Sequence, residues 1–250
     1  MINIDDKLFA EIDKELREVD LLNDEYTQIF FGDNIICTQA ALRIIMSKPD
    51  LTVETQEVQY RLDAPTGSHN VVLDVYAMDS EGKQYDIEIQ NASSGAIPQR
   101  ARYNSAMLDA HTLKPGEDYS VLKRRENIVI FITKRDVLKG NRPLYKIERI
   151  ITDTGENFND GTLIVYMNTS HKDANMSDLM KLIHDFNAKS PEELLIPEFR
   201  ERAESIAQAK KEEKVKVFKS LIKQAEAEAT AQGLAQGIAK GKAQGVAQGL

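Results

Sequence analysis

The sequence has few of the residues that disulfide-rich proteins and zinc enzymes need. Its 250 residues include one cysteine, Cys37, which excludes an internal disulfide framework and a cysteine-rich zinc site. The four histidines show none of the paired spacings of zinc enzymes, so we expect no zinc-dependent activity. The glycine-rich loops of nucleotide-binding folds and the serine elbow of hydrolases are absent as well. These absences remove several common enzyme classes from consideration.

Long apolar runs are also missing. No stretch of about 18 apolar residues occurs, so we expect no membrane span. The first twenty residues are acidic and lack the basic start of a secretory signal, so we expect no signal peptide. Charged residues make up 29% of the chain and hydrophobic residues 42%, which is typical of a globular domain with a polar extension. We therefore expect a cytoplasmic protein.

Charge is segregated along the chain. The net charge of −8 argues against a nucleic-acid partner. However, residues 1–33 hold ten acidic and three basic side chains, whereas residues 99–149 hold twelve basic and six acidic ones. Because phosphate binding depends on local positive potential, the basic block can still contact nucleic acid. The alternative is that both segments are solvated surfaces.

Two neighbouring runs predict a β-hairpin. Residues 71–78 (VVLDVYAM) are apolar except for Asp74, which predicts a strand buried on both faces. Residues 84–90 alternate, which predicts a strand with Gln84, Asp86, Glu88 and Gln90 on one face. The short connection ends in Gly82, and glycine in a left-handed conformation is common in three-residue hairpin loops.

The hairpin register brings two acidic side chains together. If Asp79 faces Lys83, then Asp74 faces Glu88, and opposed carboxylates in a sheet repel each other. A divalent cation such as Mg²⁺ removes this conflict because it takes carboxylate oxygens as ligands. Gln90 lies two residues beyond Glu88 on the same face, so we predict one site with Asp74 and Glu88 as metal ligands. In the alternative interpretation, backbone amides satisfy a buried Asp74, and Glu88 faces solvent on an edge strand.

The same residues resemble a known nuclease signature. Asp74 followed by Glu88-Ile89-Gln90 is similar to the D…(D/E)-x-K motif of the PD-(D/E)XK nuclease superfamily, with glutamine in the lysine position. The segments LDVYAMDSEGKQYDIEIQ, QRARYNSAML and LKPGEDYSVLKRRENIVIFI together resemble the recombination-promoting nucleases, or PD-(D/E)XK nuclease family transposases. This ordered set is more specific than the short acidic motif. Gln90 departs from the usual lysine, although this subgroup is similar in carrying glutamine there.

The resemblance implies an α/β fold with a restriction-endonuclease-like core, in which helices flank a central mixed sheet. It implies a DNA endonuclease that depends on Mg²⁺, or on Mn²⁺ in its place, and that is linked to recombination or mobile elements. Asp74, Glu88 and Gln90 would be the catalytic residues. A second hypothesis is a catalytically weak or inactive nuclease-like fold that binds nucleic acid or assembles with itself.

Candidate phosphate contacts follow the hairpin. Residues 97–113 have helical spacing, and Gln99 and Tyr103 stand four residues apart, similar to the Q-x-x-x-Y motif of some PD-(D/E)XK branches. Arg100 and Tyr103 also match the R-x-x-Y pattern of the family, and a cation and a phenol position a phosphate backbone without reading its sequence. The alternative is a core-edge tyrosine beside a solvated arginine.

A basic triplet, Lys123, Arg124 and Arg125, directly precedes the apolar run at residues 127–133, which predicts a central strand. We predict that the triplet contacts phosphate, although such runs are often simply solvated. Further strands are expected at residues 145–152 and 161–167, with an edge strand within residues 51–64. Helices are expected at residues 4–22, 35–46 and 173–187, and another is expected to start at Pro191. An additional acidic site residue before the sheet remains open between Asp24, Glu25 and Asp33.

The chain divides into three predicted parts. Residues 1–190 form the nuclease-like domain, residues 191–229 a charged helical extension, and residues 230–250 a low-complexity tail of Ala, Gly and Gln. Glycine recurs every fourth residue in the tail, and each glycine costs a helix about 1 kcal/mol relative to alanine. We therefore expect a tail that orders only by self-association, with a homo-oligomer formed through the C-terminal helix.

Overall fold

A computed structural model describes residues 13–64, 69–92, 95–217, 219–220 and 223–224. The chain divides into two compact units. One unit comprises Arg17–Ile206, and the other comprises Met1–Leu16 with Ala207–Leu250. The fold and the site described below belong to the first unit. The glycine-rich tail and most of the helix expected at residues 4–22 lie outside the described residues, although residues 13–16 are helical.

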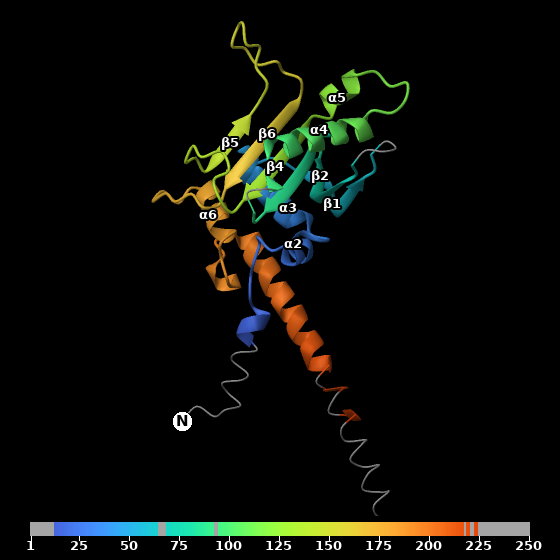
Figure 1. Cartoon of the computed structure of the whole chain (residues 1–250). Helices are drawn as coiled ribbons and strands as arrows, with labels where there is room; N and C mark the ends of the chain where they lie inside the picture. Colours follow the sequence, from blue (N-terminus) through green and yellow to red (C-terminus); the bar gives the residue numbers. More distant parts are fainter. Residues whose placement is uncertain (1–12, 65–68, 93–94, 218, 221–222, 225–250) are drawn as a thin grey trace, which may run out of the picture. The chain divides into compact units, whose positions relative to one another are not determined.

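A six-stranded mixed sheet forms the centre of the main unit (Figure 1). The strand order is β1-β2-β3-β4-β6-β5. The three central strands β3, β4 and β6 run parallel, and the outer pairings are antiparallel. The strand bounds are β1 Val53–Leu62, β2 Val71–Asp79, β3 Gln84–Gln90, β4 Asn127–Thr133, β5 Leu144–Ile147 and β6 Thr162–Asn168. This mixed sheet with flanking helices agrees with the predicted fold class.

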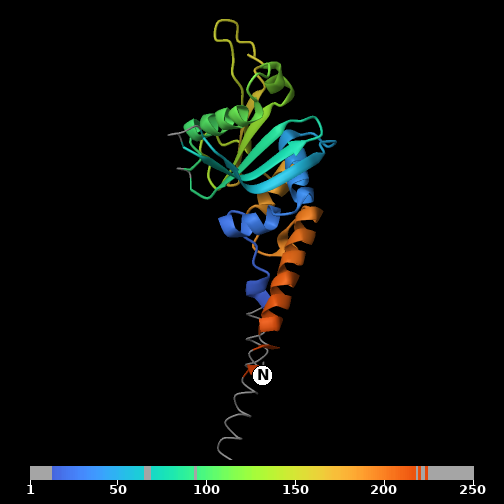
Figure 2. The same cartoon turned by 90° about the vertical axis from the view of Figure 1, so that its right-hand side faces the viewer.

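Helices cover both faces of the sheet (Figure 2). Helix α4 (Pro98–Thr112) lies on one face, where its Ala101 and Leu108 join a smaller core cluster with Leu73 and Phe131. The larger core cluster lies on the other face and includes residues of α2 (Asp24–Phe31), α3 (Ile35–Met46) and α6 (Asp178–Asp185). Two short elements complete the unit, α5 (Ser120–Arg124) and the 3₁₀ turn η2 (Pro191–Glu193).

Local sequence signals account for the best-predicted helix. The side chain of Asn34 accepts a hydrogen bond from the Cys37 amide at 3.0 Å, which caps the start of α3. Ser47 ends the helix in a left-handed conformation with φ 57°, two residues before Pro49. The helix predicted at residues 35–46 is therefore confirmed with both of its ends.

The hairpin strands reverse the predicted pattern of burial. The prediction that β2 is buried on both faces is wrong, since its residues alternate between buried and partly exposed. Strand β3, which alternates in polarity, is buried at every position except Gln90. The reason is that β3 lies in the middle of the sheet, beneath α4. Polar side chains connect the two elements, as when the Gln84 amide donates to the Thr112 hydroxyl at 2.7 Å.

Several other bounds differ from expectation. The edge strand β1 extends over ten residues, and β5 ends at Ile147 instead of continuing to residue 152. Pro191 begins only a 3₁₀ turn, and the next helix starts at residue 197. Side chains of the predicted extension, among them Leu194 and Phe199, belong to the larger core cluster.

Among the described residues, no single helix is long and apolar enough to cross a membrane. Helices α2 and α3 meet that test only as a pair, and the pair is bent by 104°.

Candidate active site

The site begins at an irregularity in the sheet. The predicted hairpin register is confirmed by the pairs Val75–Ile87 to Met78–Gln84, and one further step places Asp74 opposite Glu88. Gly82 has the predicted left-handed conformation, with φ 83°. On the other neighbouring strand, the position facing Asp74 is Gln59, which has a φ of 53°. A left-handed backbone conformation costs free energy for any residue that has a Cβ atom, and such conformations recur at functional sites.

The irregular backbone at Gln59 interrupts the pairing of β1 with β2 opposite Asp74. The β2–β3 ladder ends at Val75, so the Asp74 carboxylate lies just beyond the end of that ladder. The Ile89 amide of the neighbouring strand donates a hydrogen bond to Asp74 Oδ2 at 2.9 Å. This contact holds the carboxylate beside the strand that carries Glu88. It is also the backbone-amide contact of the alternative interpretation. Glu88, however, lies on a central strand and is fully buried, so the solvent-facing edge position of that interpretation is wrong.

Two more carboxyl-bearing positions complete an acidic cluster, which we define as Asp74, Asp86 and Glu88. Asp86 and Glu88 are both 0% exposed and face α4. The Asn104 amide of that helix donates to Asp86 Oδ2 at 2.9 Å and to Glu88 Oε1 at 3.2 Å. Asp86 Oδ1 is buried and has no hydrogen-bond partner among the described residues. The cluster therefore keeps one unpartnered oxygen in a region without solvent.

Burial raises the pKa of all three carboxyl groups, and repulsion within the cluster raises it further for Asp86 and Glu88. Burial is the largest reason that the pKa of Glu88 is raised, and the charges of Asp86 and Asp74 raise it further. Burial also raises the pKa of Asp86, against the lowering effect of the Asn104 hydrogen bond. The pKa of Asp74 is raised by burial in spite of the Ile89 amide and the Arg100 charge. The three groups thus interact electrostatically, as expected of a site built to hold positive charge.

Arg100 supplies the positive charge nearest to the cluster. Its guanidinium forms an ion pair with Glu88 Oε2 and donates to the Gly95 carbonyl at 3.3 Å. The guanidinium also lies 5.9 Å from the ring centroid of Phe131, which pairs with Glu88 across the sheet. A cation over an aromatic face is attracted to the ring, so Phe131 helps to orient Arg100. About a third of the Arg100 side chain remains exposed (34%).

Gln90 occupies the remaining corner of the site. Its amide nitrogen lies 3.5 Å from Glu88 Oε2, at the limit of a hydrogen bond. A Cβ atom at Gly95 would overlap Gln90 Oε1. The absence of a side chain at Gly95 therefore makes room for the Gln90 amide.

The structure brings together four of the predicted site residues, Asp74, Glu88, Gln90 and Arg100. It places Tyr103 elsewhere, because the Tyr103 hydroxyl donates to the His69 carbonyl at 2.6 Å. Gln99 is exposed at the start of α4. The triplet Lys123, Arg124 and Arg125 is exposed at the amino end of β4, close to the β2–β3 turn and away from the carboxyl end of β3.

Sequence reasoning missed Asp86 and Asn104. Asp86 shares the polar face of the alternating strand with Glu88, and that signal was available in the pattern. Asn104 follows Arg100 by four residues, so the two side chains lie on the same face of α4. The face of α4 that meets the acidic cluster therefore carries Arg100 and Asn104, whereas the motifs had paired Arg100 and Gln99 with Tyr103. Of the acids left open before the sheet, Asp24 is near enough for its charge to raise the pKa of Asp74.

The donor chemistry of the cluster fits a divalent cation. All its ligating atoms are carboxylate oxygens, which Mg²⁺ and Mn²⁺ prefer, and the unpartnered Asp86 Oδ1 adds an oxygen without a proton donor. Within the described ranges, no three or more histidine, cysteine, aspartate or glutamate side chains are already arranged around a common point. The Arg100 guanidinium pairs with one carboxylate oxygen of Glu88.

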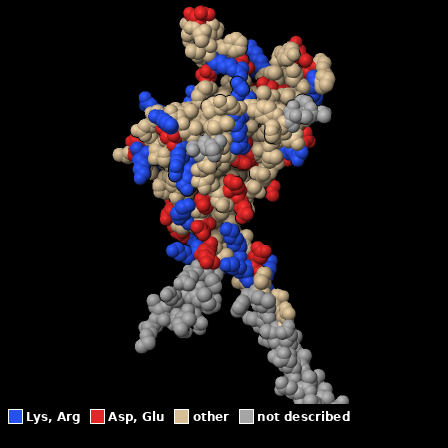
Figure 3. Space-filling model, viewed as in Figure 1, with Lys and Arg blue, Asp and Glu red and all other residues tan. Residues whose placement is uncertain are grey.

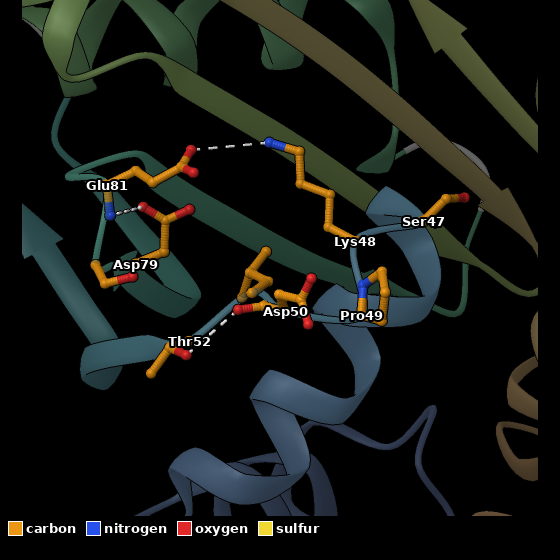
Figure 4. Close-up of a pocket in the computed structure, with 9 residues that line it drawn as sticks. Ser47, Lys48, Pro49, Asp50, Thr52, Asp79 and Glu81 are labelled. Atoms are coloured by element: carbon orange, nitrogen blue, oxygen red, sulfur yellow. Dashed lines mark hydrogen bonds and ion pairs between the residues drawn. The ribbon is translucent and has the colours of Figure 1, made fainter.

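A pocket of about 320 Å³ lies at the other end of the hairpin (Figure 4). It is lined by residues 47–52 and by Asp79, Ser80 and Glu81 of the β2–β3 turn. In Figure 4, Lys48 points toward Glu81, and the two side chains form an ion pair at 4.0 Å. None of the acidic cluster lines this pocket, so we assign the candidate chemistry to the cluster and not to the pocket.

A family model described as PD-(D/E)XK nuclease family transposase matches residues 50–230. The chain belongs to this family. The match confirms the likeness seen in the motifs, and it spans the whole sheet together with the acidic cluster, Gln90 and Arg100. Comparisons with curated proteins and with solved structures found no match.

Proposed function

We propose that this member of the PD-(D/E)XK nuclease family transposases is a Mg²⁺-dependent endonuclease that cleaves DNA and is linked to recombination or mobile elements. The observation that supports this most directly is the buried acidic cluster. Three carboxyl groups that repel one another are held together by Asn104, Arg100 and a backbone amide. A protein core does not retain such an arrangement for stability alone, because buried charges without full compensation are destabilising.

Asp74 and Glu88 are the proposed ligands of the ion, with Mn²⁺ as an alternative to Mg²⁺. When bound, the ion supplies positive charge to the scissile phosphate and lowers the pKa of an attacking water. Asp86 adds negative charge behind Glu88, and Asn104 fixes the orientation of both carboxyl groups. These residues therefore set the shape and charge of the site before substrate arrives.

In most of the superfamily one lysine supplies both a hydrogen-bond donor and a positive charge. Here Gln90 supplies the donor and Arg100 supplies the charge. The Gln90 amide orients a neighbouring water or phosphate oxygen by hydrogen bonding, but it carries no charge and no transferable proton at pH 7. Arg100 carries the charge, and its planar fork of donors suits a phosphate group. Because a third of its side chain is exposed, Arg100 can contact phosphate while Phe131 continues to support it.

The test is cleavage of plasmid DNA in Mg²⁺ or Mn²⁺ by the wild type and by D74N and E88Q. We expect cleavage by the wild type and a loss of at least about a hundredfold in either variant, because each removes a charged ligand of the ion. The matched control is E81Q, which removes an exposed carboxylate at the β2–β3 turn. Cleavage by D74N and E88Q at the wild-type rate would refute the site assignment.

The second candidate function is a catalytically weak or inactive nuclease-like fold that binds nucleic acid or assembles with itself. Two observations favour it, namely the neutral Gln90 in the lysine position and the guanidinium that pairs with Glu88. Titration calorimetry with Mg²⁺ or Mn²⁺ separates the two functions. Ion binding that disappears in E88A supports the endonuclease, whereas DNA binding without ion binding or cleavage supports the alternative. Light scattering of the full chain measures self-assembly.

A further inference from the structure

A cluster of cations lies beside the acidic cluster, on the loop that joins β4 to β5. We call residues 134–142 the basic loop, because they carry four cationic side chains and a single acid, Asp136. The cations are Lys134, Arg135, Lys139 and Arg142, and all four are exposed. The loop begins next to the site, since the Lys134 amide donates to the Gln90 carbonyl at 3.1 Å.

The one acid of the basic loop is used inside the loop. The Asp136 carboxylate accepts hydrogen bonds from the amides of Lys139 at 2.9 Å and Asn141 at 2.7 Å, and from the Tyr145 hydroxyl at 2.8 Å. Lys139 and Asn141 both have left-handed backbone, with φ of 59° and 51°. The hydrogen bonds to Asp136 offset the free-energy cost of these two left-handed residues, so the loop holds its cations in a defined conformation.

Tyr145 connects the basic loop to the row of residues that contains Glu88. Across the sheet, Glu88 pairs with Phe131, Phe131 with Tyr166, and Tyr166 with Tyr145. Neighbouring strands are about 4.8 Å apart, so Tyr145 lies roughly 14 Å from Glu88 along this row. A rise of 3.4 Å per nucleotide makes this distance about four nucleotides of a DNA strand.

The basic loop also lies at the edge of the sheet where ligands of open α/β folds bind. The parallel strands β3, β4 and β6 end together at Gln90, Thr133 and Asn168, and ligands of such sheets bind beyond the carboxyl ends. Figure 3 shows Lys and Arg side chains at the left of the main body, where Figure 1 places the loop that leads into β5. The triplet of residues 123–125 lies at the opposite, amino end of β4.

We propose that the basic loop is the surface on which the DNA backbone docks, about four nucleotides from the phosphate at the acidic cluster. The identity of the partner rests on the proposed function. The chain has a net charge of −8, and the acidic cluster repels phosphate, so binding requires a local positive surface close to the site. The basic loop meets that requirement with four cations whose only acidic neighbour in the loop is already engaged.

The experiment is fluorescence anisotropy of a labelled 30-base-pair duplex with full-length protein in EDTA, at several salt concentrations. The triple variant K134Q/R135Q/R142Q removes three charges of the basic loop. The triple variant K123Q/R124Q/R125Q removes three charges of the rival surface, and both change the net charge from −8 to −11. We expect the first to weaken binding by roughly tenfold or more and to lower the salt slope by about one per lost contact. We expect the second to weaken binding by less than about threefold.

An equal or larger loss in the residue 123–125 variant, or a loss below twofold in the basic-loop variant, would overturn the proposal. Failure of the proposed function gives a different result. If the wild type binds DNA through the basic loop but does not cleave it with Mg²⁺, only the endonuclease activity is wrong. If it cleaves DNA and the basic-loop variant binds normally, only the docking surface is wrong.

The variant D136N separates the conformation of the loop from its charge. It keeps all four cations and removes one negative charge, so charge alone predicts tighter DNA binding. If the Asp136 hydrogen bonds hold the loop in its binding conformation, D136N binds DNA more weakly, by about threefold or more, with the salt slope preserved. Tighter binding by D136N would show that the positioning role assigned to Asp136 is wrong.

Discussion

Replacing Glu88 by glutamine should stabilise the protein at neutral pH while removing metal-dependent cleavage. The Glu88 side chain is fully buried, and both burial and the charges of Asp86 and Asp74 raise its pKa. Its compensating charge, Arg100, is one-third exposed and so is partly screened by solvent. Glutamine has the same shape, and its carbonyl can still accept the Asn104 hydrogen bond.

The magnitude follows from the loss of one buried, poorly compensated charge. Each unit of pKa shift corresponds to about 1.4 kcal/mol, so the raised pKa of Glu88 corresponds to stability that a non-titrating glutamine recovers at high pH. We expect the free energy of unfolding to rise by about 2 kcal/mol at pH 8. For a domain of this size, that corresponds to an increase in Tm of roughly 4–8 °C.

The effect should depend on pH in a defined direction. Because the folded pKa of Glu88 is raised above its unfolded value of about 4.3, the folded wild type binds more protons than the unfolded chain between these two values. The contribution of Glu88 to wild-type stability is therefore fully present below about pH 4 and is lost as the pH rises through the folded pKa. E88Q does not titrate, so its advantage should be small at pH 5 and largest at pH 8.

Urea unfolding in a chelator at pH 5 and pH 8 measures this difference. The exposed control E81Q should change stability by less than about 1 kcal/mol at either pH. Adding Mg²⁺ at a hundred times its Kd should stabilise the wild type by about 2.7 kcal/mol and leave E88Q unchanged. If E88Q is instead destabilised by about 3 kcal/mol at pH 8, the Glu88–Arg100 ion pair is structural and the reasoning is wrong.

Three further predictions test neighbouring parts of the structure. G95A places a Cβ atom where the Gln90 amide now lies, so plasmid cleavage should fall at least tenfold. The free energy of urea unfolding should change by less than about 1 kcal/mol. Cleavage at the wild-type rate would mean that the orientation of Gln90 is unimportant. N104L leaves the buried carboxyl groups of Asp86 and Glu88 without their shared hydrogen-bond donor, so the free energy of unfolding should fall by about 2–3 kcal/mol at pH 8. An unchanged midpoint of urea unfolding would contradict this prediction. F199A removes a fully buried ring that packs against three others and should cost about 3–5 kcal/mol in the same assay; a cost below 1 kcal/mol would show that the segment after residue 190 is not part of the core.

The hairpin and its register could be predicted from the sequence because the information is local. Alternation in β3, the apolar run in β2 and a glycine in the turn are all contained in twenty consecutive residues. A short turn leaves few registers open, so opposing Asp74 and Glu88 required no knowledge of the rest of the chain. The ends of α3 were predictable for the same reason, since Asn34 and Pro49 act within a few residues of where they stand.

The contents of the acidic cluster depended on tertiary structure. Helix α4 buries Asn104 and Thr112 against the polar face of β3, so its apolar pattern did not identify the face that meets the sheet. Hydrophobic periodicity predicts burial only where apolar residues provide it. For that reason, Arg100 could be predicted from its motif, but its neighbour Asn104 could be identified only from the packed helix.

The position of the basic loop was likewise settled by the assembled sheet. Residues 134–142 and the triplet 123–125 flank the same strand, and their compositions do not distinguish them as phosphate contacts. Because β3 and β4 pair in parallel, the segment that follows β4 lies beside Gln90. The two strands are about forty residues apart in the sequence, and local periodicity does not predict which distant strands pair. The chain by itself therefore determined its hairpin and its opposed acids, whereas the parallel pairing of β3 with β4 determined which basic segment begins next to Gln90.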